Sequence, residues 1–439
     1  MSCGTHFKFE VKFKEMSSDY LKVVLLKQGA QVRDGNKYRL TPFGVTNGEI
    51  ISAPIESAQK LTDHEDVKTV YRVVFNSANI NHAFVPGDTI GVLPSNNEDV
   101  IDEILARLNV ASSANEVCEL QILEGTLKKN PSVPKHLPPK STLKKIFQNH
   151  VDVHTPPKKL FLKSLARFTQ DPQERAHLEH LCSPKGSSDY TKLITTSGRT
   201  LLGLLKTFPS CGPPVEVLLE HLPPLQARPY SISSSPLSGK LEITFFVVVR
   251  DDGSKGLCTG WLERLIEEKA DIPVPFYFRQ ATAFRFPKEL PELPVILIAT
   301  GTGIAPFRGF LQDLELQGRF NRDIWLFYGC RYKDKDFLFK DEIQEFEKSG
   351  VLKKLSLSFS REQRQKEYVQ HRIEASPDFF EWILHKDASV FICGDAKTVV
   401  TDVRTCICQT VGKYCGASDG EAVVRRMEST GRLIVDTWS

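Results

Sequence analysis

Five stretches of the chain carry the pattern of β-strands. At positions 7–13, phenylalanine or valine alternates with lysine or glutamate, which is the period of two expected of a half-buried strand. Val67–Phe75 is rich in β-branched residues, and Thr89–Leu93 follows a Pro-Gly-Asp turn. Strand signals return only at Arg228–Ser234 and Leu241–Val249. The pattern therefore predicts a β-rich domain that is split in the sequence.

Helical periodicity fills the gap between these strands. Apolar residues recur at helical spacing in Val100–Leu108, Leu160–Phe168 and Leu201–Phe208, and a proline-rich stretch at Pro131–Pro139 separates the first of these from the second. We expect a helical insertion over residues 95–206.

A different alternation begins at Pro294. Short apolar runs at Val295–Ala299, Ile324–Tyr328, Leu355–Phe359 and Val390–Cys393 are separated by helical segments, which is typical of a parallel α/β sheet. The predicted organisation is an N-terminal extension (1–48), a split β-domain (49–94 and 207–288), the helical insertion (95–206) and an α/β domain (289–439).

Composition narrows the class of protein. A chain of 439 residues exceeds one ordinary core and implies two or three domains. The net charge of +3 gives no argument for a nucleic-acid partner, and the apolar run Leu293–Ala299 is too short to span a bilayer. The first residues lack the pattern of a secretory signal, so we expect a cytoplasmic protein whose ten cysteines are reduced. Cys406, Cys408 and Cys415 are the cysteines closest to a metal-binding spacing, but no fourth ligand at a suitable spacing accompanies them, so no metal is expected.

The first chemical signal is a glycine-rich turn after the strand Val295–Ala299. Gly301, Thr302 and Gly303 lead directly into a predicted helix. Glycines let backbone amides approach a phosphate, and the N-terminus of the helix offers unpaired N–H groups to it. Such a turn suits a dinucleotide, although taken alone it is as often simply a tight turn.

A cluster of cations strengthens the case for a nucleotide. Ser360 and Arg361 end the strand Leu355–Phe359, and Lys366 and Tyr368 follow. An arginine can hold a phosphate dianion through two parallel hydrogen bonds, which favours NADPH over NADH. Either cation taken singly would be assigned to a solvated loop. Because both lie in the same predicted domain as the glycine turn, we expect them to bind the phosphate of a nucleotide.

Two more stretches point to a second nucleotide. The sequence Arg228-Pro229-Tyr230-Ser231 places a cation, a ring and a hydroxyl within four residues of a strand, and alternation sends Tyr230 to one side. Gly256-Leu257-Cys258-Thr259 opens a predicted helix that runs to Lys269 and again offers backbone donors to a pyrophosphate. Two dinucleotide sites are therefore predicted.

Together these motifs resemble the ferredoxin-NADP reductase superfamily, specifically its diflavin members. The resemblance covers the chain from about Ile51 to Ser439, and the motifs occur in the family order. It is densest at Arg228–Ser234, Gly256–Leu262, Gly301–Phe307, Ser360–Gln370, Cys393–Asp395 and Asp436–Ser439. It implies an α/β and all-β multidomain fold: an antiparallel flavin-binding β-barrel with a helical connecting insertion, followed by a parallel α/β nucleotide-binding domain.

The resemblance implies an oxidoreductase that uses FAD and NADPH. For FAD, it implies that Arg228 meets the phosphate, that Tyr230 stacks on the isoalloxazine and that Ser231 reaches N5. Pro229, between Arg228 and Tyr230, belongs to the same FAD-binding motif. The loop of Gly256, Leu257, Cys258 and Thr259 would hold the pyrophosphate of FAD. Trp438 would shield the other face of the flavin.

For NADPH, the resemblance implies two groups of residues. The backbone phosphates would lie at the glycine turn around Thr302. The 2′-phosphate end and nearby groups of the nucleotide would be met by Ser360, Arg361, Lys366, Tyr368, Val369, Gln370 and Asp402.

Hydride transfer requires the nicotinamide to stack closely on the flavin. Trp438 would therefore have to move aside. Ser231, Cys393 and Asp436 resemble the family's trio at the transfer site, where a carboxylate can stabilise the positive nicotinamide that develops. Ser231 could equally serve only a strand end, and Cys393 could serve only packing.

The electron acceptor stays open at this stage. Among diflavin reductases, the chain resembles the branch that reactivates cobalamin-dependent methionine synthase more than the branch that serves cytochrome P450, on the stretches Phe208–Pro214, Glu220–Pro223, Arg228–Ser231 and Gly256–Trp261. About fifty residues precede the barrel and none resembles a flavodoxin phosphate loop, so we expect a separate FMN-containing domain or protein as partner, with methionine synthase beyond it. A reductase for another acceptor (cytochrome P450, a flavodoxin-like protein or sulfite reductase) and a catalytically idle FAD/NADP-binding regulator are the alternatives.

Overall fold

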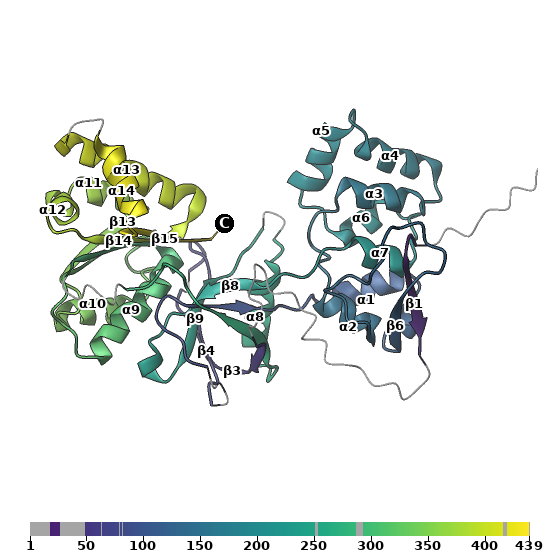
Figure 1. Cartoon of the computed structure of the whole chain (residues 1–439), viewed down its shortest axis with the longest axis horizontal. Helices are drawn as coiled ribbons and strands as arrows, with labels where there is room; N and C mark the ends of the chain where they lie inside the picture. Colours follow the sequence, from purple (N-terminus) through teal and green to yellow (C-terminus); the bar gives the residue numbers. More distant parts are fainter. Residues whose placement is uncertain are drawn as a thin grey trace, which may run out of the picture. The chain divides into compact units, whose positions relative to one another are not determined.

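A computed structural model describes residues 18–26, 49–62, 64–78, 80, 82–250, 253–286, 293–415 and 419–438 of the chain. The chain divides into two compact units, residues 1–42 with 94–226 and residues 43–93 with 227–439 (Figure 1). The strand predicted at positions 7–13 lies outside the described residues. In the described part of the chain, no helix has the length and apolar character needed to cross a bilayer.

The first unit is built mainly of helices around one apolar core. Its helices are α1 (Glu98–Arg107), α2 (Leu143–Asn149), α3 (Lys159–Ala166), α4 (Pro172–Cys182), α5 (Ser187–Tyr190), α6 (Leu201–Thr207) and α7 (Val215–His221). α1 shows why these segments are helical: the Asn97 side chain accepts the N–H groups of Asp99 and Val100, and the apolar face buries Ile101 and Ile104.

The helical unit also contains a small antiparallel sheet that the periodicity did not predict. Its order is β1-β6-β7, from β1 (Leu21–Leu25), β6 (Val117–Ile122) and β7 (Lys140–Thr142). The first of these strands comes from the predicted N-terminal extension. A 3₁₀ turn at Ala111–Ser113 and a π-helical segment at Thr191–Thr196 complete the unit.

The helical unit ends later in the sequence than the predicted boundary at residues 206–207. The unit extends to Gln226 because α7 packs into the same core, with Leu218 and Leu219 fully buried there. The barrel segment therefore resumes at Ala227, directly before the Arg-Pro-Tyr-Ser stretch.

The second unit begins with two antiparallel sheets that enclose one core, as expected of the flavin-binding barrel. Their orders are β2-β10-β5-β8 and β3-β4-β9. The strands are β2 (Ile51–Ala53), β3 (Ile55–Lys60), β4 (Val70–Phe75), β5 (Thr89–Val92), β8 (Arg228–Ser231), β9 (Leu241–Phe246) and β10 (Val274–Arg279). An isolated bridge between Ile232 and Ile243 links the two sheets, and α8 (Leu257–Glu267) buries Trp261 and Leu262 against them.

The rest of the second unit is a five-stranded parallel sheet, which confirms the predicted α/β nucleotide-binding fold. The order is β13-β12-β11-β14-β15, from β11 (Val295–Thr300), β12 (Ile324–Cys330), β13 (Lys354–Phe359), β14 (Ser389–Asp395) and β15 (Leu433–Trp438). α9 (Ile304–Leu316) and α10 (Lys340–Ser349) cover one face, and α11 (Val369–Glu374), α12 (Pro377–His385), α13 (Thr401–Cys415) and α14 (Asp419–Ser429) cover the other (Figure 1). The strand order reverses between β11 and β14, the place where ligands bind in open α/β sheets.

Candidate functional site

The strand β8 carries the stretch predicted to meet the flavin. It pairs with β5 so that Arg228 lies opposite Val92, Tyr230 opposite Ile90 and Ser231 opposite Thr89. Successive side chains of a strand point to opposite faces of the sheet. Arg228 and Tyr230 therefore point to one face, and the exposed Pro229 and Ser231 point to the other.

Tyr230 is half-buried and has a second aromatic ring behind it. The ring of Phe245 lies 5.8 Å away in an edge-on arrangement, centroid to centroid. Burial, together with the thiol of Cys258, raises the pKa of Tyr230 well above its usual value, so its hydroxyl is neutral. The sequence had not pointed to Phe245, which lies in the predicted strand Leu241–Val249 like any other core residue.

The predicted transfer trio converges in space. The hydroxyl of Ser231 donates to Asp436 Oδ2 at 3.1 Å, although the two residues are 205 positions apart. Asp436 lies next to Cys393 because β14 and β15 pair in parallel with these two residues in register. One member thus comes from the barrel and two come from the nucleotide-binding domain.

The electrostatics of the trio follow from its burial. Burial raises the pKa of Asp436, while the hydrogen bond from Ser231 and the nearby Arg279 act in the opposite direction. Burial and the neighbouring Asp436 raise the pKa of Cys393 well above that of a free thiol. Cys393 is therefore a neutral thiol at this site and not a thiolate nucleophile.

Trp438 is the last residue of β15, which is an edge strand of the parallel sheet. Trp438 lies in β15 opposite Asp395 of β14, two residues beyond Asp436. The structure describes the backbone of Trp438 and not its side chain.

The loop before α8 brings backbone donors together. The N–H of Gly256 donates to the carbonyl of Val248 at 2.8 Å, and the hydroxyl of Thr259 accepts the N–H of Val248 at 3.2 Å. A Cβ atom at Gly256 would come within 2.9 Å of both Thr259 and Val248, so the tight turn requires glycine. Leu257 and the buried Cys258 form the first turn of α8.

Two polar features here fit a flavin nucleotide. Thr89 Oγ1, opposite Ser231, is buried and has no hydrogen-bond partner among the described residues. α8 begins at Leu257, and Gly256 before it provides no side-chain cap, so the positive end of the helix dipole at this N-terminus favours an anion. A group with polar ring atoms at one end and a pyrophosphate at the other suits this arrangement.

The glycine turn after β11 adopts the conformation that the sequence suggested. Gly301 has a φ of +52°, open space lies where its Cβ would be, and its carbonyl accepts the hydroxyl of Tyr328 at 3.2 Å. Thr302 and the buried Gly303 complete one 3₁₀ turn before α9 begins. The turn lies at the carboxyl end of the central strand, beside the point where the strand order reverses.

The residues predicted for the 2′-phosphate lie along β13, α11 and α13. The N–H groups of Ser360 and Arg361 extend the pairing of β13 with β12 by donating to the carbonyls of Cys330 and Arg331 at 3.0 and 2.9 Å. Arg361 and Lys366 are exposed, and Tyr368 is 42% exposed immediately before α11.

The remaining three residues predicted to lie near the nucleotide differ in how far they are buried. Val369 is buried, and its side chain would clash at 2.9 Å with a Cβ at Gly329, so it packs behind the sheet edge. Gln370 is half-buried, and its carbonyl accepts the Cys406 thiol of α13 at 3.4 Å. Asp402 is exposed on α13.

A cavity of about 630 Å³ lies beside these strand ends and was not predicted. Its lining combines the loop between β3 and β4 with the end of β9, and it includes Lys60, His64, Lys68 and Arg331. Burial and the nearby Arg331 lower the pKa of Lys68, whose ammonium lies 3.8 Å from the centre of the Phe246 ring. Lys60, His64 and Lys68 come from β3 and the loop after it, and only Arg331 is contributed by the α/β domain.

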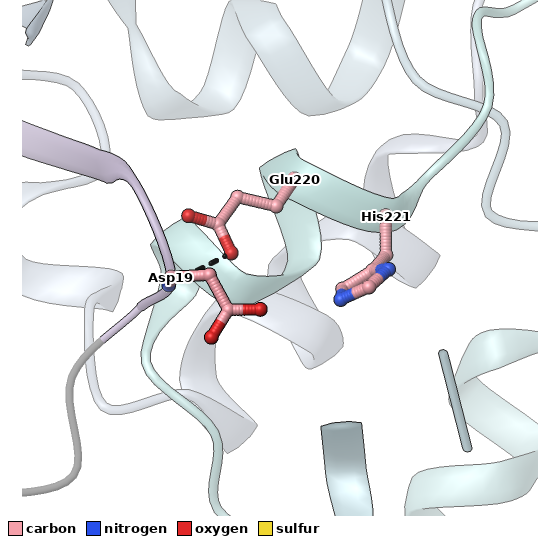
Figure 2. Close-up of side chains that lie close together, drawn as sticks. All are labelled: Asp19, Glu220 and His221. Carbon is pink, nitrogen blue, oxygen red and sulfur yellow. Dashed lines mark hydrogen bonds between the residues drawn. The ribbon is translucent and has the colours of Figure 1, made fainter. Parts of the chain in front are cut away.

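Asp19, Glu220 and His221 bring ligand-type atoms within 4.8 Å of one another in the helical unit (Figure 2). The three already have protein partners. Glu220 Oε2 accepts the N–H of Asp19 at 3.1 Å, its Oε1 accepts two further N–H groups of the same segment, and His221 Nε2 lies 2.8 Å from the hydroxyl of Ser164. The group anchors β1 to α7. The cysteines whose side chains are described are all free.

Two family models match the chain in the order that the fold presents. One described as an FAD binding domain matches residues 45–261, and one described as an oxidoreductase NAD-binding domain matches residues 297–405. The FAD-binding model includes both the β8 stretch and the loop before α8. The NAD-binding model includes the glycine turn and the residues predicted for the 2′-phosphate.

Several known proteins are similar over most of the chain. The chain is 35% identical to methionine synthase reductase of Rattus norvegicus, over 97% of this chain and 65% of that protein. It is 35% identical to methionine synthase reductase of Homo sapiens over 89% of this chain and 61% of that protein. It is 33% identical to NADPH–cytochrome P450 reductase of Cavia porcellus over 80% of this chain and 53% of that protein. The chain thus spans less than two thirds of the length of each of these relatives.

Proposed function

Because the chain belongs to the FAD- and NAD-binding oxidoreductases of the ferredoxin-NADP reductase type, we propose that it oxidises NADPH and passes the electrons through FAD to an FMN-containing domain or carrier protein. The observation that supports this most directly is the hydrogen bond between Ser231 and Asp436, with Cys393 beside it. It brings the predicted transfer residues of the two domains to one point, where a hydride could pass between their cofactors.

The barrel residues would hold FAD along β8 and α8. Tyr230 would stack on the isoalloxazine, with Phe245 supporting its ring. Arg228 and the loop Gly256–Thr259 at the N-terminus of α8 would meet the phosphates, since a guanidinium and a helix N-terminus both favour anions. When bound, FAD supplies the chemistry, because its N5 position accepts a hydride from a nicotinamide.

The α/β domain would hold NADPH at the carboxyl edge of its sheet. The turn at Gly301–Gly303 would receive the pyrophosphate, with Thr302 contacting it. Arg361, Lys366 and Tyr368, which are exposed, would bind the 2′-phosphate together with the half-buried Ser360. The cavity beside this edge has a lining of mixed charge, with Glu65 and Asp66 beside the cations, and its Lys68 and Arg331 would be the groups that attract phosphates.

At the transfer point, each residue has a separate task. The hydroxyl of Ser231 would lie at the flavin N5 position, held in orientation by its bond to Asp436. The carboxylate of Asp436 would stabilise the positive charge that develops on the nicotinamide. The neutral, buried Cys393 would pack beneath the ring and exclude water.

The acceptor is the part of the proposal that depends on the relatives. The greater similarity to methionine synthase reductases favours an FMN-containing carrier, domain or protein, that delivers electrons to methionine synthase. A reductase for another acceptor has the support of the cytochrome P450 reductases, at slightly lower identity over less of the chain. Reduction assays with a flavodoxin-like carrier, with and without methionine synthase, distinguish the two.

An anaerobic absorbance titration of the purified chain tests the reductase function. One equivalent of NADPH should bleach the flavin bands, and one equivalent of NADH should barely change them. A colourless protein that does not take up FAD, or a yellow protein that neither nucleotide reduces, would favour the catalytically idle FAD/NADP-binding regulator.

The C-terminal tail offers a prediction about cofactor preference. We expect removal of Trp438 and Ser439 to let the nicotinamide ring stack on the flavin without displacing an aromatic side chain. The ratio of kcat/KM for NADPH to that for NADH should then fall by about tenfold or more, as binding energy from the 2′-phosphate becomes less decisive. Steady-state kinetics with both nucleotides measure this ratio, and an unchanged ratio would show that Trp438 does not cover the flavin.

A further inference from the structure

A buried arginine of the α/β domain reaches into the barrel. Arg308 lies on α9, is 1% exposed, and donates four hydrogen bonds to three acceptor groups. Its Nη1 donates to Glu242 Oε2 and to the carbonyl of Ser233, both at 2.7 Å, and its Nε donates to Glu342 Oε2 at 2.7 Å. Glu242 and Ser233 belong to the barrel, whereas Glu342 belongs to α10 of the α/β domain. One guanidinium thus bridges the two domains.

The barrel side of this bridge is itself held rigidly. Glu242 is 1% exposed on β9, and Arg72 of β4 donates to both of its oxygens at 2.8 Å. Burial would raise the pKa of Glu242, but hydrogen bonds and charge from Arg72 and Arg308 outweigh burial and lower it. The carboxylate is therefore ionised, and its orientation is fixed from two sides.

The same face of α9 makes further contacts with the segment after β8. A Cβ at Gly309 would lie 3.3 Å from the carbonyl of Ser234, so the helix approaches this segment closely. One turn later, Gln312 Oε1 accepts the N–H of Ser235 at 2.8 Å, and Asp313 Oδ1 accepts its hydroxyl at 2.6 Å. The segment 233–235 is thus fastened to α9 at several successive positions.

Segment 233–235 and α9 each adjoin one of the two proposed cofactor sites in the sequence. Segment 233–235 is joined to Ser231 by Ile232 alone, and α9 begins directly after the Gly301–Gly303 turn. We propose that Arg308 and Glu242 are positioning residues, which fix the distance between Ser231 and the glycine turn and so hold the two cofactors in register for hydride transfer. This inference rests on the proposed reductase function.

The chemistry of the bridge favours positioning over plain stability. A buried ion pair loses hydration on both partners, so apolar residues of similar volume often give equal or greater stability. Hydrogen bonds from a planar guanidinium to three fixed acceptors, however, hold one relative orientation of two domains in a way that apolar contacts do not. A displacement of about 1 Å from the reactive geometry can lower a rate by about a hundredfold.

The test compares two substitutions of the same kind. Arg308→Lys keeps the charge and leaves Glu242 paired with Arg72, but an ammonium does not reproduce the three-acceptor fork. Arg432→Lys is the matched control, because Arg432 bonds only within the α/β domain, to Asp387 at 2.8 Å and to the carbonyls of Ile383 and Ala388.

Three measurements on the full chain separate positioning from stability. In single-turnover experiments, Arg308→Lys should lower the rate constant of flavin reduction by NADPH about tenfold, and the control should leave it within about twofold. Calorimetric titration with NADP⁺ should give the same affinity in both variants, since neither touches the predicted nucleotide contacts. Hydrogen exchange, which does not depend on activity, should rise at the amides of segment 231–235 only in Arg308→Lys.

Each outcome bears on the inference. Equal rates in Arg308→Lys and in the control, or unchanged exchange at 231–235, would overturn it. A loss that appears as weaker NADP⁺ binding would also overturn it, because it would place Arg308 in nucleotide binding. If Arg308→Lys fails to fold, Ser235→Ala removes the bond to Asp313, together with the local bond from the N–H of Leu237, and should lower the rate about threefold in the same direction. A wild-type chain that NADPH does not reduce would reject the proposed function, while exchange still reports on the bridge.

Discussion

Asp436→Asn is expected to lower the rate of flavin reduction by NADPH about a hundredfold, because the amide does not carry the negative charge that would stabilise the developing nicotinamide cation. The substitution keeps the size of the side chain and can still accept the hydrogen bond from Ser231. The change should therefore appear equally in kcat and in kcat/KM, as for an interaction made only in the transition state.

The pH dependence provides a second readout for the same variant. Burial raises the pKa of Asp436 above that of an exposed aspartate. The ionised form is the one that stabilises a cation, so the wild-type rate should rise with pH as this proton is lost, and the rise should extend above the usual titration range of aspartate. In Asp436→Asn this step should disappear.

Asp378→Asn is the matched control for the charge change. Asp378 is an exposed carboxylate of the same domain and pairs with Lys354 on the surface, so its substitution should leave the rate unchanged. A normal rate in Asp436→Asn, or a pH step that survives in it, would show that Asp436 is not the stabilising carboxylate.

Arg361→Ala is expected to raise the KM for NADPH about 30-fold, the loss anticipated when charge-assisted hydrogen bonds to a phosphate are removed. The value of kcat should change little, because the 2′-phosphate is remote from the reacting atoms and contributes equally to ground-state and transition-state binding. The KM for NADH, which lacks this phosphate, should stay nearly constant, so that the variant discriminates less between the two nucleotides.

Steady-state kinetics with both nucleotides test this expectation. Arg425→Ala is the control, because it removes the same charge from an exposed position on α14, where the arginine pairs with Glu421 at 3.1 Å. If KM rises equally for NADPH and NADH, Arg361 contributes general attraction for anions and not recognition of the 2′-phosphate.

Local signals predicted most elements of the barrel and of the α/β domain. The strands Thr89–Val92, Leu241–Phe246 and Val295–Thr300 lie within a residue or a few residues of their predicted bounds. Each is specified by its own alternation or apolar run and by the turns that flank it, and these are properties of neighbouring residues. The same holds for the glycine turn, since a left-handed residue at Gly301 is a local requirement.

Prediction was weakest where pairing partners are distant in the sequence. The strand Leu21–Leu25 was assigned to an extension, yet the side chain of Glu220 accepts N–H groups at its start from 200 positions away. The helical unit extends to Gln226 for the same reason, because α7 completes a core that earlier helices begin. No local pattern reveals such a partner.

By itself, the sequence determined that the chain has two nucleotide-binding motifs on a split barrel and a parallel α/β domain, because strands, turns and phosphate-binding loops depend on residues that adjoin in the chain. Only the tertiary structure decided that Ser231 bonds to Asp436, that Arg308 reaches Glu242 and that Arg331 lines a cavity with Lys68. These contacts join residues far apart in sequence, and they form only when the hydrophobic faces of separate elements are buried against each other.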